Sequence, residues 1–120
     1  MAKAPGVEPM AATVVALLER YAKLAARAKT PERMEHVFGE LQGALHDAAH
    51  AAKHWSEVEV RAVMDAVSDV DPFNVAGRVS KDHVLVPDKA VAWLTNYTAK
   101  WVKKLRGRAS AASSRRGRST

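Results

Sequence analysis

The chain has 120 residues, of which 48% are hydrophobic, 27% charged and 6% aromatic, and its formal net charge is +6. This length suits one domain with a modest core, and this composition excludes a wholly disordered chain, a collagen and a bundle of membrane spans. None of these values identifies a reaction.

The first predicted helix runs from about residue 9 to about residue 29. Pro9 suits the first helical position, because its missing N–H would have no partner there. Apolar residues then recur with helical spacing and form one buried stripe: Val14, Leu17, Leu18, Tyr21, Leu24 and Ala28. We expect residues 1–8 to form a flexible arm ahead of this helix.

The second predicted helix begins at Thr30-Pro31-Glu32 and ends near residue 54. Thr30 can cap it, Pro31 can occupy the first position, and Glu32 suits the positive end of the helix dipole. Its buried face is predicted to contain Met34, Val37, Phe38, Leu41, Leu45, Ala48 and Ala52.

The third predicted helix begins with a capping box, in which Ser56 is the cap and Glu59 reaches back to it. Asp71-Pro72 ends this helix, because a residue before proline avoids the α region. Residues 73–87 form either a short β-hairpin or an irregular loop. Pro87 then opens a fourth helix that ends near residue 105.

These patterns predict a mainly α, compact four-helix domain over residues 9–105, with the hairpin or loop between helices 3 and 4. Residues 106–120 have no apolar period and are rich in Ser, Arg, Gly and Ala, so we expect a disordered basic tail. The predicted core includes Leu17, Leu18, Tyr21, Phe38, Leu41, Leu45, Val63, Val67, Leu94 and Val102.

The positive charge is concentrated at one end of the sequence. Residues 100–120 contain no Asp or Glu, whereas residues 1–99 carry 11 cations against all 13 acids, a net of −2. The eight cations of the basic end are Lys100, Lys103, Lys104, Arg106, Arg108, Arg115, Arg116 and Arg118. These residues are the predicted phosphate contacts, because Lys and Arg neutralise nucleic-acid phosphates without reading sequence. A solubility tail, or compensation of the helix dipole by Lys103 and Lys104, is the alternative explanation.

A sequence-reading role for the third helix is excluded on charge. Residues 56–70 carry four acids against Arg61 alone, a net of −3, which phosphates would repel. The order of elements otherwise permits a winged-helix topology.

Metal and catalytic motifs are sparse. His46 and His50 are spaced by four residues, as in metal-chelating helices, but the glutamate of the HExxH motif is missing. They are weak metal candidates, and a polar helix edge is the favoured interpretation. The chain has no cysteine, no nucleophile elbow and no glycine-rich phosphate loop. We therefore expect no catalytic residues, no cofactor and no enzymatic activity.

Trp93, Tyr97 and Trp101 form a stripe on the fourth helix that is predicted to be an interface, since exposed Trp and Tyr favour protein contacts. A membrane-surface role for this stripe is disfavoured, because a helix at a membrane surface needs a wide apolar face to spare. The apolar residues beside the stripe are needed to close the core: Val91, Leu94, Val102 and Leu105. The longest uncharged runs have ten residues, and a span needs about 20, so no membrane span is expected. The missing cysteines are compatible with a reducing cytoplasm, where we place the protein.

Together these features predict a non-enzymatic protein that binds DNA or RNA phosphates non-specifically through its basic C-terminal segment, while the helical body makes protein contacts or self-associates. The alternative is a protein-interaction or structural module whose basic tail is not a specific site. The lack of isoleucine and the abundance of Ala and Val are typical of a GC-rich genome, such as that of an actinobacterium or one of its phages.

Overall fold

The computed structural model describes the backbone of residues 10–118 and the side chains of residues 10–105. Five helices follow one another: α1 (Met10–Arg27), α2 (Pro31–Ala51), α3 (Glu57–Asp69), α4 (Pro72–Val79) and α5 (Pro87–Arg118). The mainly helical prediction is confirmed, and the described residues contain no strand.

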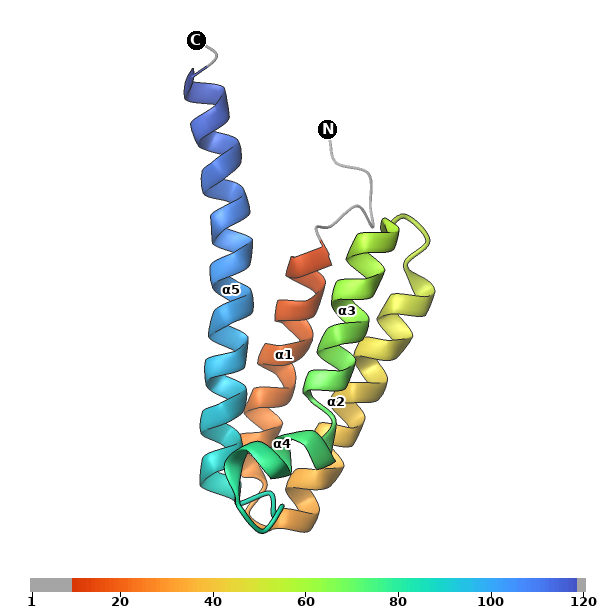
Figure 1. Cartoon of the computed structure of the whole chain (residues 1–120), viewed down its shortest axis with the longest axis vertical. Helices are drawn as coiled ribbons and strands as arrows, with labels where there is room; N and C mark the ends of the chain where they lie inside the picture. Colours follow the sequence, from red (N-terminus) through yellow and green to blue (C-terminus); the bar gives the residue numbers. More distant parts are fainter. Residues whose placement is uncertain (1–9, 119–120) are drawn as a thin grey trace.

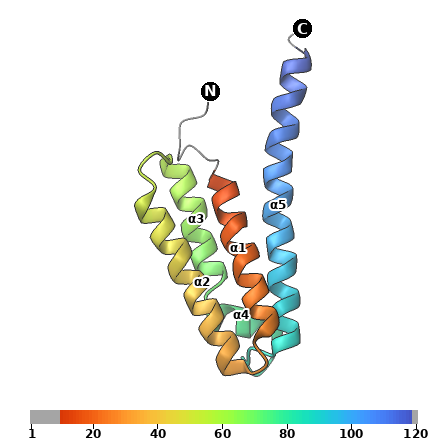
Figure 2. The same ribbon diagram turned by 180° about the vertical axis from the view of Figure 1, so that it is seen from behind.

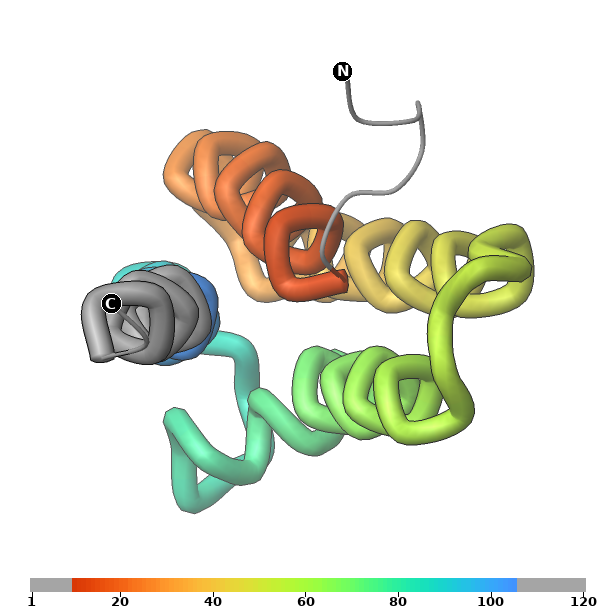
Figure 3. The backbone as a smooth tube through the Cα atoms, turned by 90° about the horizontal axis from the view of Figure 1, so that it is seen from above, coloured from red at the N-terminus to blue at the C-terminus, as the bar shows by residue number. Residues whose placement is uncertain are grey.

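The four longer helices alternate in direction and α4 crosses one end of their bundle (Figure 1). Seen from above, α1, α2, α3 and α5 surround a common centre (Figure 3). Helix α1 packs against both α2 and α5, and α2 packs against α3 (Figure 2). Short connections between antiparallel neighbours are typical of an up-and-down bundle. None of the described helices is long and apolar enough to cross a membrane.

The core lies along the centre of this bundle. Leu18, Phe38, Leu41, Leu45, Val63 and Leu94 are fully buried, as predicted. The other four predicted core residues are partly buried and pack against that cluster: Leu17, Tyr21, Val67 and Val102. The apolar period of the four predicted helices therefore identified the side that faces the neighbouring helices. Leu24 is an exception, because it was expected on the buried stripe of α1 and is 38% exposed.

The expected number of helices was wrong, because α4 stands where the hairpin was predicted. Asp71 caps α4 by accepting hydrogen bonds from the N–H groups of Phe73 (2.9 Å) and Asn74 (3.4 Å). Pro72 occupies the first turn, where its missing N–H costs nothing. Val75 and Ala76 are buried against the bundle. Residues 80–86 then form an irregular loop in which His83 has a positive φ of 57°.

Helix α5 does not end near residue 105 as predicted but continues to Arg118. It extends past the ends of α1, α2 and α3 (Figure 1). The side chains of the predicted tail, residues 106–120, and the whole of the predicted arm, residues 1–8, lie outside the described residues.

Candidate nucleic-acid interface

The three lysines of the basic segment whose side chains are described all lie exposed on α5. Leu94 and Thr98 belong to the buried stripe of α5. Lys100, Lys103 and Lys104 lie outside this stripe and therefore face away from the bundle. Within the described part of the chain, no carboxylate forms an ion pair with any of them. Their ammonium groups are consequently available to an external anion.

The length of α5 removes one explanation for these lysines. The stabilising effect of a cation on the helix dipole is limited to the last turn. Lys103 and Lys104 lie well before Arg118, where α5 ends. Dipole compensation therefore does not account for them. The five arginines beyond them lie outside the described side chains: Arg106, Arg108, Arg115, Arg116 and Arg118.

Trp101 belongs to the core rather than to an open surface. Its side chain is 5% exposed and is part of the buried cluster. The Lys104 Nζ lies 4.7 Å from the centroid of the Trp101 ring, within the range of a cation–π contact. Trp101 thus fixes the rotation of α5 about its axis, and that rotation sets the outward direction of the lysines.

Trp93 and Tyr97 are partly buried and are engaged within the molecule. Their rings stack with centroids 4.9 Å apart and an interplanar angle of 10°. The Trp93 ring also contacts Phe38, at 6.1 Å between centroids, and the Arg78 guanidinium lies 5.7 Å from its centroid. The predicted interface stripe therefore connects α5 to α2 and α4 inside this chain.

The Tyr97 hydroxyl donates a hydrogen bond of 2.8 Å to Asp69 Oδ2 at the end of α3. Burial raises the pKa of Tyr97 well above the usual value for a phenol, and the hydrogen bond to the Asp69 carboxylate acts in the same direction. Arg78 is 3.8 Å from the other oxygen of Asp69. Sequence reasoning missed this cluster, because no spacing rule relates residues 69, 78 and 97.

The two weak metal candidates do come together. The Nε2 atoms of His46 and His50 are 3.0 Å apart, within hydrogen-bond distance. His54, the next histidine along the sequence, instead packs edge-on near Trp55. Among the described side chains, no group of three or more potential metal ligands is present.

The surface also carries exposed apolar side chains that the sequence did not single out. Val58 on α3 is 78% exposed and Phe73 on α4 is 71% exposed. Phe73 stacks on His83, with ring centroids 5.6 Å apart, beside a hollow of about 280 Å³. A larger hollow of about 460 Å³ lies between the end of α1 and the start of α2 and is lined in part by Leu24 and Val37.

Comparisons of this chain with family models, with curated proteins and with solved structures find no match.

Proposed function

We propose that this protein is a non-enzymatic, nucleic-acid-associated protein that binds phosphates non-specifically through the basic segment of α5, residues 100–118. The observation that carries the proposal is the charge partition. All eight cations of that segment lie on one helix, and the segment contains no acidic residue, whereas residues 1–99 have a net charge of −2.

The presentation of the described lysines supports this proposal. Lys100, Lys103 and Lys104 are exposed and have no carboxylate partner among the described residues, so binding a phosphate breaks no internal ion pair. The acidic side chains of the body disfavour phosphate binding elsewhere, since long-range repulsion opposes the approach of a polyanion. A phosphate backbone is therefore attracted to one end of the molecule.

The test measures binding of the full-length protein to duplex DNA across a salt series. The slope of log affinity against log salt is about −0.9 for each phosphate neutralised, so engagement of all eight cations gives a slope of about −7. Replacing Lys100, Lys103 and Lys104 with Gln is expected to make the slope less negative by up to about 3 and to weaken binding at low salt.

The matched control replaces three exposed cations at the other end of the bundle, Lys23, Arg27 and Lys29, with Gln. This variant has the same net charge as the α5 variant and is expected to retain most of the affinity. Equal loss in both variants, or no binding by the wild type near 0.15 M salt, would refute the proposal.

The second candidate function is a protein-interaction module, which the exposure of Val58 and Phe73 favours. Large exposed apolar side chains are frequent at protein contacts. Under this alternative, Lys100, Lys103 and Lys104 can be replaced without loss of partner binding, whereas replacing Phe73 with Ser weakens it. Self-association measured by analytical ultracentrifugation of wild type and Phe73→Ser provides a first test of it.

A further inference from the structure

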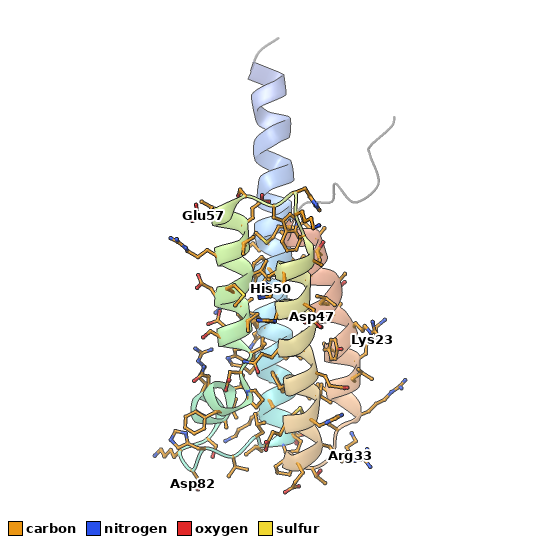
Figure 4. The ribbon with its side chains drawn as sticks, turned by 90° about the vertical axis from the view of Figure 1, so that its right-hand side faces the viewer. Lys23, Arg33, Asp47, His50, Glu57 and Asp82 are labelled. Atoms are coloured by element: carbon orange, nitrogen blue, oxygen red, sulfur yellow. The ribbon has the colours of Figure 1, made fainter. Side chains whose placement is uncertain are left out.

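The outer face of α2 carries two imidazoles in direct contact. His46 and His50 are one helical turn apart, both are exposed, and their ring centroids are 4.3 Å apart. Figure 4 labels His50 and the neighbouring Asp47 on the same half of α2. The Nε2 atoms lie 3.0 Å apart, so the two nitrogens that point toward each other are also those best placed to share one ligand.

Asp47 favours the tautomer of His46 that metal binding requires. Its Oδ1 atom lies 3.8 Å from His46 Nδ1, so its negative charge stabilises a proton on that nitrogen. In that tautomer the Nε2 atom of His46 carries no proton and can accept from the Nε2–H of His50, although the contact itself fits either direction. If His50 moves its proton to Nδ1, both Nε2 lone pairs become available, and no proton leaves either neutral ring.

The separation of the two nitrogens, which is that of the hydrogen-bonded pair, is close to the separation that one shared metal ion needs. With metal–nitrogen bonds of about 2.0–2.1 Å, two nitrogens 3.0 Å apart define an angle of about 90° at the metal. A tetrahedral ion would require a nitrogen separation of about 3.3 Å or more for the same bond lengths. An angle near 90° suits adjacent positions of a tetragonal ion, which is the preference of Cu²⁺ and Ni²⁺.

We propose that His46 and His50 form a two-imidazole chelating site for a divalent transition-metal ion, which binds Cu²⁺ most tightly, then Ni²⁺ and Zn²⁺. This order follows the general order of affinities of divalent metals for nitrogen ligands. Water fills the remaining positions, because both side chains are exposed and the described residues supply no third ligand. This site is independent of the basic segment of α5, and the two proposals can fail separately.

The test uses the full chain without a histidine tag and Cu²⁺ as the probe. Calorimetry is expected to show one Cu²⁺ bound per chain, and the electron paramagnetic resonance spectrum is expected to show two imidazole nitrogens. His46→Ala and His50→Ala each leave one imidazole, which we expect to weaken binding at least tenfold, about the smallest loss typical of damage to a metal site. Alanine favours the helix, so both variants should fold.

Two controls separate chelation from mere histidine content. His54→Ala removes a histidine outside the pair and is expected to leave the affinity unchanged. The double variant His50→Ala/Ala26→His keeps the number of histidines but places the second imidazole on an exposed position of α1, where no residue three or four positions away is His, Asp or Glu.

The proposal requires this double variant to bind Cu²⁺ as weakly as His50→Ala does. If the double variant binds as tightly as the wild type, or if His54→Ala is as damaging as His46→Ala, the chelating pair is refuted. A spectrum with one nitrogen in the wild type refutes it as well.

Discussion

The Tyr97 hydroxyl on α5 and the Asp69 carboxylate at the end of α3 are joined by a hydrogen bond of 2.8 Å. Asp69 also contacts Arg78 of α4, at 3.8 Å, and the Arg78 guanidinium lies over Trp93 of α5. Three helices that are separate in sequence therefore share one polar cluster. This cluster holds α4 and the first half of α5 in a fixed relation to α3.

Replacing Tyr97 with Phe is expected to lower the free energy of unfolding by about 1 kcal/mol, the net value of a typical partly buried hydrogen bond. The phenyl ring keeps its stacking on Trp93, so the loss reports on the hydroxyl. Urea unfolding followed by tryptophan fluorescence measures the difference. Tyr21→Phe is the control, since the Tyr21 hydroxyl has no hydrogen-bond partner among the described side chains and backbone groups. An equal loss there would contradict the assignment.

The same hydroxyl predicts a loss of stability in alkali. The folded state raises the pKa of Tyr97 above the value of 10.0 for a free phenol. Above that pH the unfolded chain releases the phenol proton while the folded chain retains it. The free energy of unfolding therefore falls as the pH rises. The stability advantage of wild type over Tyr97→Phe should therefore be unchanged at neutral pH and shrink progressively as the pH rises above 10.0. Parallel stability curves for the two proteins would contradict this prediction.

Asp71 is expected to matter more than an ordinary surface acid. Its Oδ1 caps α4, and its Oδ2 accepts a hydrogen bond of 3.0 Å from Gln42 Nε2. Asp71→Ala removes a helix cap and a side-chain partner together, with an expected cost of about 2 kcal/mol.

The variant Asp71→Asn separates the two roles of this carboxylate. Its amide oxygen can still cap α4, but its NH₂ group cannot accept from Gln42, so we expect about half the cost of Asp71→Ala. Chemical denaturation of both variants and of Gln42→Ala measures these differences. Equal costs for Asp71→Asn and Asp71→Ala would show that the cap contributes little.

Gly77 on α4 lies close to the ring of His83. A Cβ atom at this position would lie 3.0 Å from His83 Nδ1 and 3.1 Å from His83 Cε1. In a His83→Ala background, Gly77→Ala should stabilise the protein by up to about 1 kcal/mol, because alanine is the better helix former. In the wild type the clash should cancel much of that gain. A double-mutant cycle measures the coupling, and identical effects in both backgrounds would contradict the predicted contact.

The helix starts were the most predictable part of the fold. Ser56 and Glu59 form the predicted capping box, with hydrogen bonds of 3.1 Å and 2.9 Å, and the Thr30 side chain accepts from the N–H of Arg33. Such helix starts can be recognised from the sequence because they depend on residues within one turn of each other. The same locality explains why the apolar stripes of α1, α2 and α3 located the core.

Helix α4 was missed although its start has the same signature as α2. Thr30-Pro31 and Asp71-Pro72 are both a capping residue followed by proline at the first helical position. Asp71-Pro72 also marks the end of α3, and the sequence predicted only that end. The segment after it is short and contains Gly77 and two valines, which weaken a helix intrinsically. Burial of Val75 and Ala76 against the bundle, which the sequence cannot show, outweighs that weakness.

The aromatic residues of α5 were harder to place, because their spacing is compatible with two environments. A stripe of Trp93, Tyr97 and Trp101 can be a free interface or the margin of the core. The partners that decide between these are Phe38, Asp69 and Arg78, which lie on three other helices. The approach of His46 to His50, by contrast, depends only on helical spacing and was predictable.

The loop over residues 80–86 offers a single-point attachment site. Asp82 is exposed at the end of the bundle beside α4 (Figure 4), whereas α5 runs toward the opposite end (Figure 1). The chain contains no cysteine, so Asp82→Cys would provide a unique thiol for a dye or a solid support. A molecule tethered there would direct the far end of its longest helix into solution, and its α2 face would remain accessible.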